Sequence, residues 1–509
     1  MEDWFEAHKI TPEQARLARI ILEQVRAGAD VFAVTRRHPL PGGGYLAKHV
    51  LVAVYQQLVA EGQWPADAAL LARIRMKPVR SLSGVTTVTV LTRPHPCPGQ
   101  CIFCPTEPEM PKSYLADEPG AARAFQHRFD PYAQVRSRLD SYLAVGHPIE
   151  KIELLILGGS WSSYPHSYQE MFVRRCFDAL NGCNSGSLSE AQQCNEGARS
   201  RNVGLVVELR PDQVTMAELA WLRRLGVTKV QMGAQSLDDC ILALNRRGHT
   251  AADTLRATAL LRAAGFKIVL HWMPNLLGAT PQSDQADFGR LWQGYCPDEI
   301  KIYPTQLLES AALYAFWQSG DYQPYATETL VDLLASLKPD IPPYCRVNRI
   351  IRDIPAQHIV AGSRRSSLRQ DVLEEVARRG QRCRCVRCRE VRGQAVQAED
   401  LVLQDFSYPA GWAEEHFLQF VTPEDRLAGD LRLSLPGPQS LDLGMADLQG
   451  AALVREVHVY GQALAVGAEQ PGAAQHAGLG RRLIEAAASL AFERGFRRLA
   501  VIAAIGTRQ

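Results

Sequence analysis

The stretch that fixes the expected fold is Leu82–Pro105, LSGVTTVTVLTRPHPCPGQCIFCP. Within it, Val85–Leu91 is a β-branched apolar run, which predicts a buried strand. Cys97, Cys101 and Cys104 follow, with three and then two residues between them. One loop can therefore hold three corners of a cubane iron–sulfur cluster and leave the fourth iron open to chelate S-adenosylmethionine. The alternative for this spacing is a three-cysteine zinc knuckle.

The chain after Val85 alternates short apolar runs with amphipathic segments. Strand–helix alternation with continuously apolar strands implies a parallel sheet that is covered by helices. Six such units favour an α/β fold with an open, partial (β/α)6 barrel over a closed barrel of eight units. The predicted strands are Val85–Leu91, Ile152–Leu157, Val203–Leu209, Lys229–Met232, Ile268–Met273 and Ile300–Tyr303.

The segments on either side of the barrel have different patterns. Thr11, Pro12 and Gln14 predict the start of a helix with a capping box. We expect an N-terminal helical segment at residues 1–80, the barrel at 81–340, an arginine- and cysteine-rich linker at 341–395 and an α+β domain at 396–509. A length of 509 residues agrees with several domains, because one hydrophobic core rarely serves so long a chain.

The composition is that of a globular protein of the cytoplasm, with 46% hydrophobic and 22% charged residues. The N-terminus lacks the pattern of a signal peptide, and no apolar run reaches the roughly 18 residues that span a bilayer. We therefore expect no membrane association. In a reducing compartment, clustered cysteines are metal ligands or free thiols more often than disulfides.

The net charge of +2 conceals two strongly basic stretches. Arginine and lysine clusters neutralise phosphates, and arginine binds them in bidentate fashion. A solvated or salt-bridged surface is the alternative interpretation. The candidate RNA-binding residues are Arg73, Arg75, Lys77, Arg80, Arg346, Arg349 and Arg352.

A second group of cysteines, Cys383, Cys385 and Cys388, lies among arginines. Positive neighbours lower the pKa of a thiol, and the thiolate is the form that binds metals. A structural zinc site needs four nitrogen or sulfur ligands. The sequence does not identify the fourth ligand; the candidates are Cys345, His358 and His416. Reduced free thiols are the alternative.

A glycine-rich turn, with Gln475, Gly478, Gly480 and Arg481, precedes an amphipathic helix near the C-terminus. Backbone N–H groups at such a helix start can bind a pyrophosphate. The pattern resembles the Q-x-x-G-x-G signature of the GNAT acetyltransferases, whose ligand is acetyl-CoA. Taken alone, such a turn is more often a plain helix entry.

Several further motifs follow one another in a recognisable order. They are Leu157–Pro165, Glu208–Asp212, Val230–Ser236, Arg247–His249, His271–Pro274, Lys301–Pro304 and Arg352–Pro355. Together with the cysteine motif, they resemble the family of the Elongator catalytic subunit, which joins a radical SAM domain to a GNAT-like domain. The resemblance runs from roughly Arg36 to the C-terminus.

The resemblance implies roles for individual residues. Cys97, Cys101 and Cys104 would hold a 4Fe-4S cluster, and Lys301 would be catalytic with them. Cys383, Cys385 and Cys388 would bind a structural zinc. The residues expected to contact S-adenosylmethionine are Phe103, Gly158, Gly159, Glu208, Arg210, Gln235 and Ser236.

The family's activity implies a transfer-RNA-modifying enzyme. It would use the cluster and acetyl-CoA to install a carboxymethyl group on carbon 5 of the wobble uridine. Partners would be transfer RNA and either a second copy or Elongator-like subunits. The alternatives are a protein lysine acetyltransferase with a structural cluster, another radical SAM enzyme, or a transfer-RNA-binding protein with impaired catalysis.

Family members continue beyond the segment that matches Gly506-Thr507-Arg508, whereas this sequence stops at Gln509. We therefore expect a GNAT-like domain that is incomplete at its C-terminus. Such a pocket would bind acetyl-CoA weakly, because the thioester end is less well positioned than the pyrophosphate.

Overall fold

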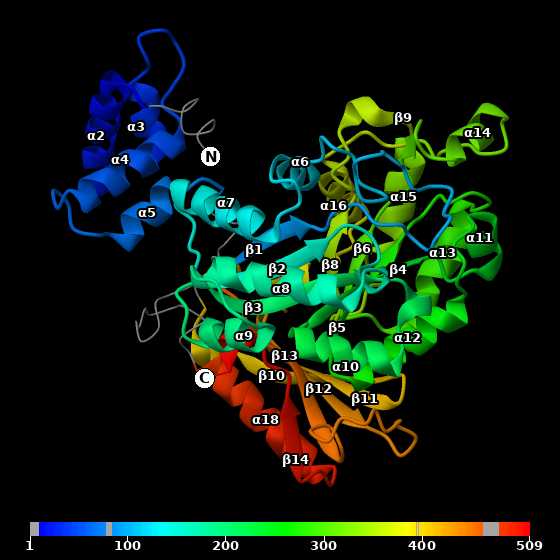
Figure 1. Ribbon diagram of the computed structural model, residues 1–509. Coiled ribbons are helices and arrows are strands. Elements are labelled where there is room, and N and C mark those ends of the chain that lie inside the picture. The colour runs from blue at the N-terminus through cyan, green and yellow to red at the C-terminus, as the bar shows by residue number, and fades with distance from the viewer. Residues whose placement is uncertain (1–9, 78–83, 393, 395, 462–477, 509) are drawn as a thin grey trace.

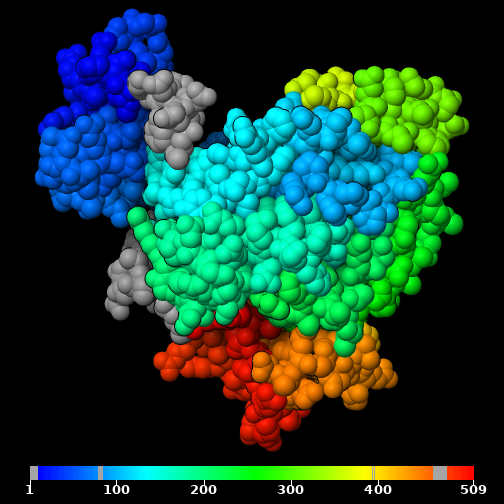
Figure 2. Space-filling view, in the orientation of Figure 1, coloured from blue at the N-terminus to red at the C-terminus, as the bar shows by residue number. Residues whose placement is uncertain are grey.

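The computed structural model describes residues 10–77, 84–392, 394, 396–461 and 478–508 (Figure 1). In these residues an N-terminal helical lobe, a helix-covered parallel sheet and a mixed C-terminal sheet follow one another. The lobe projects from one side of the barrel, and the C-terminal sheet packs beneath it (Figure 2). No described helix combines the length and the apolar character needed to cross a membrane.

The N-terminal lobe packs around a hydrophobic core of its own, which includes Ile21, Leu22 and Leu51. The predicted capping box is confirmed: the Gln14 N–H donates to Thr11 Oγ1 over 3.2 Å, and the Thr11 N–H donates to Gln14 Oε1 over 3.0 Å. Because its core is separate, the lobe is a structural unit beside the barrel. Its helices are α2 (Pro12–Arg26), α3 (Val31–Arg37), α4 (Lys48–Ala60) and α5 (Ala68–Ile74).

The central sheet has seven strands in the order β1-β2-β3-β4-β5-β6-β8, and every neighbouring pair is parallel. The predicted partial barrel is confirmed, with one strand more than the six expected. The strands are β1 (Val85–Leu91), β2 (Lys151–Leu157), β3 (Arg201–Leu209), β4 (Lys229–Gln235), β5 (Lys267–Trp272), β6 (Glu299–Ile302) and β8 (Arg346–Ile350).

The additional strand, β8, lies in the segment that was expected to be a linker. Its sequence, RVNRI, contains three polar residues among its five, and only Val347 and Ile350 are buried. A half-exposed strand at the edge of a sheet lacks the continuous apolar run by which the buried strands were recognised. The barrel therefore extends further along the chain than the composition suggested.

Helices cover the outer face of this sheet, and short strands β7 (Leu307–Leu308) and β9 (Ile359–Ala361) pair above it. The first helices are α6 (Pro119–Gln126), α7 (Pro131–Ala144), α8 (His166–Asn181), α9 (Leu188–Glu196), α10 (Met216–Leu225) and α11 (Asp239–Leu244). The later ones are α12 (Ala251–Ala263), α13 (Pro281–Arg290), α14 (Leu313–Gln318), α15 (Thr327–Leu337), α16 (Leu368–Arg378) and α17 (Val386–Arg389).

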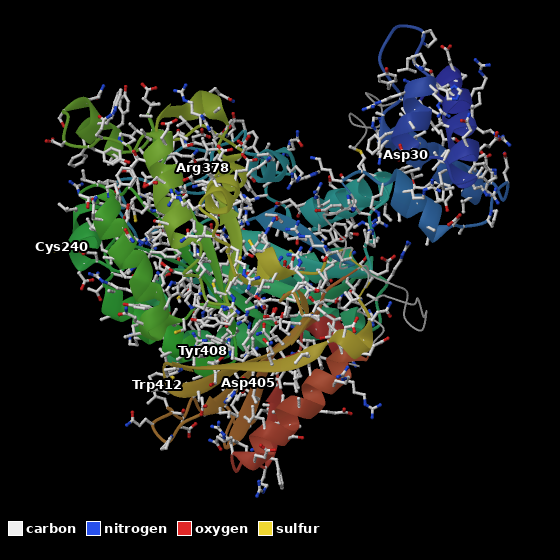
Figure 3. All side chains as sticks on the ribbon, turned by 180° about the vertical axis from the view of Figure 1, so that it is seen from behind. Asp30, Cys240, Arg378, Asp405, Tyr408 and Trp412 are labelled. Atoms are coloured by element: carbon white, nitrogen blue, oxygen red, sulfur yellow. The ribbon has the colours of Figure 1, made fainter. Side chains whose placement is uncertain are left out.

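The C-terminal sheet has the order β10-β11-β12-β13-β14. The first four strands pair antiparallel, whereas β13 and β14 pair parallel, so the predicted α+β arrangement is confirmed. Asp405, Tyr408 and Trp412 mark this sheet in Figure 3. Its elements are β10 (Val402–Ala410), β11 (Ala413–Val421), β12 (Leu427–Pro436), β13 (Ala451–Val459), α18 (Leu479–Glu493) and β14 (Arg498–Val501).

Buried ion pairs attach the C-terminal sheet to the amino ends of the barrel strands. Asp298, next to the first residue of β6, lies 2.8 Å from Arg455 Nη2 and 3.3 Å from Arg432 Nη1. Burial alone would raise the pKa of Asp298, but the charges of Arg455 and Arg432 hold it well below its usual range. The two sheets are therefore joined by charges that stay ionised at neutral pH.

Candidate functional site

The loop that carries Cys97, Cys101 and Cys104 follows β1, at the carboxyl end of the parallel strands. Ile102, in the middle of this loop, is buried and bonded on both sides of its backbone. Its N–H donates to the carbonyl of Asn245 over 3.3 Å, and its carbonyl accepts the N–H of Leu313 over 2.8 Å. Carboxyl ends of parallel strands are the usual place for a ligand site in such sheets.

The sulfur atoms of the loop have polar partners. Arg247 Nη1 lies 3.3 Å from Cys101 Sγ, and the Gly99 N–H lies 3.4 Å from Cys97 Sγ. A hydrogen bond from Cys104 lowers the pKa of the Cys101 thiol, and the nearby Arg247 and Arg210 charges lower it further, against the effect of burial. The loop therefore favours a thiolate at Cys101, which is the form that binds iron.

Arg210 approaches the cysteine loop closely. A Cβ atom at Gly99 would collide with the guanidinium of Arg210, so a larger residue there would displace that group. Arg210 Nη2 donates to the carbonyl of Arg247 over 2.8 Å, and Nε donates to Asp212 over 3.0 Å. Among the described residues, Nη1 is buried without a partner, and so is Oε1 of Gln235 at the end of β4. Unpaired buried polar atoms are costly, so these two fit a polar ligand beside the cysteines.

The two glycines after β2 differ in their surroundings. Both have positive φ angles, 124° at Gly158 and 108° at Gly159. A Cβ atom at Gly158 would lie 2.1 Å from Thr92 Oγ1, whereas one at Gly159 would meet open space. Gly158 is therefore required by packing against the end of β1, and Gly159 faces the cavity described below.

Gln235 and Ser236 were expected to act alike, but the structure gives them different surroundings. The Ser236 hydroxyl donates to Asp287 Oδ2 over 3.1 Å and accepts the Asp238 N–H over 3.1 Å. Gln235 lines the cavity and has a left-handed backbone, with φ of 68°. The serine hydroxyl is thus engaged in the turn, while the glutamine presents a free oxygen.

A polar cluster crosses the inside of the barrel below the cysteines. Lys301 Nζ donates to Oε1 of Gln231, and His271 Nε2 lies 3.0 Å from the same oxygen. A lysine ammonium can only donate, so the shared atom is the amide oxygen and His271 carries its proton on Nε2. Burial and the charge of Lys301 lower the pKa of His271. His271 is thus neutral, with Nδ1 as its basic nitrogen.

Glu208 lies near the same ring nitrogen of His271 as Gln231 does. The Tyr114 hydroxyl donates to Glu208 Oε2 over 3.1 Å, and His271 Nε2 lies 4.0 Å from Glu208 Oε1. Burial raises the pKa of Glu208, although Lys301 opposes this shift. Glu208 and Lys301 therefore belong to one connected group of acids and bases. No role was expected for Tyr114, Gln231 or His271, although the motifs Val230–Ser236 and His271–Pro274 contain the last two.

One cavity of about 1630 Å³ runs from the cysteine loop to the C-terminal sheet. At one end it is lined by the three cysteines and Phe103, and in the barrel interior by charged residues. Lys229 Nζ lies 2.7 Å from Glu153 and 3.5 Å from Glu299, so these interior charges are paired. At the other end the lining residues are His458, Tyr460, Gly461, Ile502 and Thr507. The two ends of the barrel thus share one space.

The glycine-rich turn is described only in part. Gln475 lies outside the described residues. Gly478 is the N-cap of α18 with a φ of 65°, and Gly480 lies in its first turn. Arg481 points to solvent and pairs with Glu485 one turn later. The described part of the turn therefore offers a helix start to a ligand but no buried arginine.

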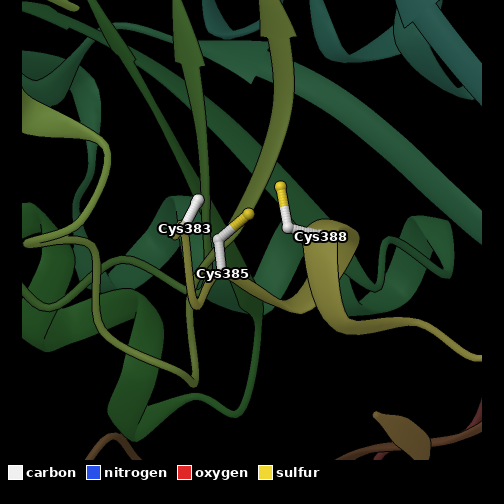
Figure 4. Close-up of side chains that lie close together, drawn as sticks. All are labelled: Cys383, Cys385 and Cys388. Atoms are coloured by element: carbon white, nitrogen blue, oxygen red, sulfur yellow. The ribbon is translucent and has the colours of Figure 1, made fainter. Parts of the chain in front are cut away.

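Cys383, Cys385 and Cys388 meet with all three sulfur atoms within 4.8 Å of one another (Figure 4). Thiolates about 2.3 Å from a tetrahedral zinc lie about 3.8 Å apart, so this trio fits a single ion. Buried Lys338 lies beside it, with Nζ 3.9 Å from the sulfurs of both Cys385 and Cys388. Such an ammonium would offset the negative charge of three thiolates.

The candidates for a fourth zinc ligand lie outside this trio. His358 is paired with Asp117, at 2.6 Å, and His416 is paired with Asp405, also at 2.6 Å. Cys345 is buried near Cys385 but is not part of the trio that the described residues form. Instead, the side chain that the structure places beside two of the sulfurs is that of Lys338. No pattern in the sequence links Lys338 to these cysteines.

Most of the candidate RNA-binding residues are engaged within the fold. Arg73 donates to the carbonyls of Val25 and Ala29, and Arg75 donates to that of Gly146. Lys77 ends the described part of the lobe and lines the cavity, and Arg80 lies outside the described residues.

The same holds for two of the three arginines near β8. Arg346 pairs with Glu390, and Arg352 bonds Ser113 and Glu118. Arg349 pairs with Asp353 but keeps 46% of its side chain exposed, at the wall of the cavity. Of these three, only Arg349 offers an accessible guanidinium.

Known proteins resemble the chain over most of its length. A model of the radical SAM superfamily matches residues 95–286, and a model of the Radical_SAM C-terminal domain matches residues 297–378. The tRNA uridine(34) acetyltransferase of Dehalococcoides mccartyi is 42% identical over 84% of this chain and 95% of its own length. Elongator complex protein 3 of Homo sapiens is 33% identical over 86% and 83%.

A solved structure agrees with these sequence relatives. The archaeal Elp3 of Methanocaldococcus infernus, with residues 1–46 deleted, superposes with a TM-score of 0.73. It is 35% identical and is matched over 84% of this chain and 95% of its own. The similarity therefore covers both the barrel and most of what lies beyond it.

Proposed function

Because the chain belongs to the family of tRNA uridine(34) acetyltransferases and Elongator complex protein 3, we propose that it modifies carbon 5 of the wobble uridine in transfer RNA. The modification would be a carboxymethyl group derived from acetyl-CoA. A radical SAM domain implies a 4Fe-4S cluster and S-adenosylmethionine as its cofactors.

The observation that carries this proposal is the continuous cavity of about 1630 Å³. A radical reaction that uses two co-substrates needs both reacting ends in one enclosed space, shielded from water. The cavity reaches the cysteine loop at the carboxyl ends of the strands, and β13 and the residues after β14 at their amino ends. A protein acetyltransferase with a structural cluster would have no need of such a connection.

The cysteine loop supports the cofactor assignment. When bound, a 4Fe-4S cluster with S-adenosylmethionine supplies the hydrogen-atom abstraction that unactivated carbon requires. Cys97, Cys101 and Cys104 would hold the cluster. The unpaired atoms Arg210 Nη1 and Gln235 Oε1 would bind polar groups of S-adenosylmethionine, with Phe103 against its adenine. Gly159 leaves room for the ligand, and Gly158 holds the loop in place.

The polar cluster inside the barrel supports a role in handling the nucleobase. His271 presents Nδ1 as an acceptor because Gln231 and Lys301 fix its proton on Nε2. Lys301 offers a donor to carbonyl oxygens, such as those of uracil, and the raised pKa of buried Glu208 favours its protonated carboxyl as a second donor. Positioned donors and acceptors in a buried site orient a flat polar base effectively.

Acetyl-CoA would occupy the opposite end of the cavity. The start of α18 at Gly478 and Gly480 would receive its pyrophosphate, together with Gln475. The acetyl end would enter the cavity near Tyr460 and His458, which line it. Arg481 is exposed and would act, if at all, on the outer part of the coenzyme.

Two further parts of the chain complete the proposal. Transfer RNA would bind at the mouth of the cavity near Arg349 and the N-terminal lobe, and further copies or Elongator-like subunits would be its protein partners. Zinc at Cys383, Cys385 and Cys388, beside Lys338, would fix the segment between the two sheets. This metal would be structural, because it lies away from the cysteine loop in the fold.

The proposal is tested by anaerobic reconstitution of the cluster, followed by incubation with transfer RNA, S-adenosylmethionine and acetyl-CoA. Nucleoside mass spectrometry should detect carboxymethyluridine only when all three are present. Cys240→Ala is a matched control, because this exposed cysteine belongs to neither cluster. Acetylated protein formed without S-adenosylmethionine, and no modified uridine, would overturn the proposal in favour of a lysine acetyltransferase.

A further inference from the structure

Asn245, which caps the C-terminus of α11, is fully buried with 0% exposure, and its side chain makes three hydrogen bonds. Its Oδ1 accepts the Leu277 N–H over 3.2 Å. Its Nδ2 donates to the carbonyls of Leu277, over 3.0 Å, and Ile241, over 2.8 Å. One amide thus joins the end of α11 to the loop after β5.

The backbone of the same residue reaches the cysteine loop. The Asn245 carbonyl accepts the N–H of Ile102, which stands between Cys101 and Phe103. Ile102 has no strand or helix partner of its own in the loop, so this bond and the one from Leu313 fix its height above the sheet. A shift of Asn245 would therefore move Ile102 and, with it, the neighbouring Cys101.

A second connection runs from Asn245 to Cys101 through a tight turn. Arg246 has a left-handed backbone, with φ of 51°, and its N–H bonds the Ala243 carbonyl. This turn aims Arg247 at Cys101 Sγ, 3.3 Å away, and at the carbonyl of Gly233, 2.6 Å away. The position of the guanidinium at the sulfur thus depends on where α11 ends.

The loop that Asn245 holds is itself anchored on its far side. The Asn275 N–H donates to Asp284 Oδ2 of α13 over 2.8 Å, and the Tyr322 hydroxyl donates to the Asn275 carbonyl over 2.9 Å. Asn275 has a left-handed backbone, with φ of 66°. A buried chain of contacts therefore runs from α13 through Leu277 and Asn245 to the cysteine loop.

We infer that Asn245 is a positioning residue, which sets the place of Cys101 and of Arg247 relative to the strand-end loops around them. The inference rests on the proposed function in that it takes the cysteine loop to hold an iron–sulfur cluster, and it names a residue on which the geometry of that cluster depends. Asn245 acts through Ile102 and Arg247 and does not touch the cofactor itself.

The experiment compares Asn245→Asp with Asn195→Asp in the full chain after anaerobic reconstitution. Asn195 is a comparable buried asparagine in α9, outside the loop of Cys97, Cys101 and Cys104: it is also 0% exposed, and its Nδ2 donates to Asn181 and Ser200 while its Oδ1 accepts the Asn202 N–H. Both substitutions replace the amide donor with an acceptor that faces carbonyl or amide oxygens. Both should therefore lower the thermal midpoint by a similar amount.

Only Asn245→Asp should change the cluster. We expect an altered electron paramagnetic resonance spectrum of the reduced cluster with S-adenosylmethionine, and a roughly tenfold rise in KM for S-adenosylmethionine that exceeds the change in kcat, because displaced loops misplace the ligand. Asn245→Ser, which retains a small polar group, should show the same changes to a smaller degree and serves if the aspartate variant does not fold.

Two results would overturn the inference. One is a normal spectrum and a normal KM in the folded Asn245 variants; the other is an equal disturbance in Asn195→Asp. Failure of the proposed function is distinguishable, because wild-type protein would then form no cluster that cleaves S-adenosylmethionine, or would leave transfer RNA unmodified while the Asn245 effect on the cluster remains.

Discussion

The two cysteine trios of this chain each lie within a short stretch of sequence, but their geometry in space differs. Cys383, Cys385 and Cys388 converge until all their sulfur atoms lie within 4.8 Å of one another. Among the described residues this is the one such group, so Cys97, Cys101 and Cys104 do not converge to that degree. The first trio is spread along a loop that faces a large cavity, and the second is packed beneath a helix.

The difference indicates which kind of metal group each trio would suit. A single tetrahedral ion needs sulfurs that almost touch, whereas each cysteine of a cubane cluster binds a separate iron. The neighbouring cations differ too: Arg247 reaches one sulfur of the first trio, and Lys338 lies between two sulfurs of the second. Spacing alone predicts a metal site, and the packing decides its size.

The largest expected effect is that of Cys101→Ala, which should abolish formation of 5′-deoxyadenosine from S-adenosylmethionine. Two remaining thiolates cannot hold the cluster, so iron content should fall while the far-ultraviolet circular dichroism spectrum is unchanged. Cys240→Ala should behave as wild type. Wild-type cleavage by the Cys101 variant would show that this trio does not hold the catalytic cluster.

Cys385→Ser should have the converse effect. We expect loss of one bound zinc per chain and a fall in the thermal midpoint of about 5 °C or more, because a structural metal contributes to folding. Iron content and S-adenosylmethionine cleavage should persist. Elemental analysis and differential scanning fluorimetry measure both. If zinc content is unchanged, the second trio consists of free thiols and the contrast between the trios does not hold.

Asp284→Asn should alter how the stability of the protein depends on pH. Asp284 anchors the loop after β5, which lies next to the loop of the first trio. Burial raises the pKa of Asp284 from 3.8 to about 7. A raised acid contributes stability that is complete below pH 3.8 and is lost as the pH rises through 7. At about 1.4 kcal/mol per pKa unit, the ionised carboxylate costs the folded state on the order of 4 kcal/mol.

The asparagine variant avoids this cost, since its amide oxygen can still accept from Asn275 and Tyr325. Its thermal midpoint relative to wild type should therefore rise between pH 5.5 and pH 8. Thermal unfolding of apo protein at both pH values measures the difference. A difference that does not change with pH would mean that Asp284 titrates with an ordinary pKa.

The smallest expected effect is that of Arg349, which lies on β8 and lines the cavity. Arg349→Glu should weaken transfer-RNA binding and reduce the slope of log affinity against log salt by about 1, as expected for one lost phosphate contact. Arg378→Glu is the control, because Arg378 is 74% exposed on α16 and does not line the cavity. Equal effects of the two variants would point to general electrostatics.

Arg346 and Arg352, which the sequence placed in the same basic group, are expected to behave differently. Their guanidinium groups are engaged with Glu390, Ser113 and Glu118. Charge reversal there would leave buried or half-buried acids without partners, so it should lower the thermal midpoint. An effect on RNA affinity without loss of stability would return them to the RNA-binding surface.

The sequence by itself determined the features that depend on neighbouring residues. The alternation of Val85–Leu91 and its successors with amphipathic segments predicted the parallel sheet, because burial of a strand is recorded in consecutive side chains. The spacing of Cys97, Cys101 and Cys104 predicted a metal loop, because one short loop can hold all three. Strand β8 escaped this reasoning because only part of it is buried.

Only the tertiary structure decided which distant residues meet. Arg247 is 146 residues from Cys101, Lys338 is 47 residues from Cys385, and Arg352 is 239 residues from Ser113. Nothing local in the chain distinguishes a paired arginine from a free one, since both are charged and flexible. The packing of helices and strand ends brings these partners together, and with them it decides which cations serve the cysteines and which remain for RNA.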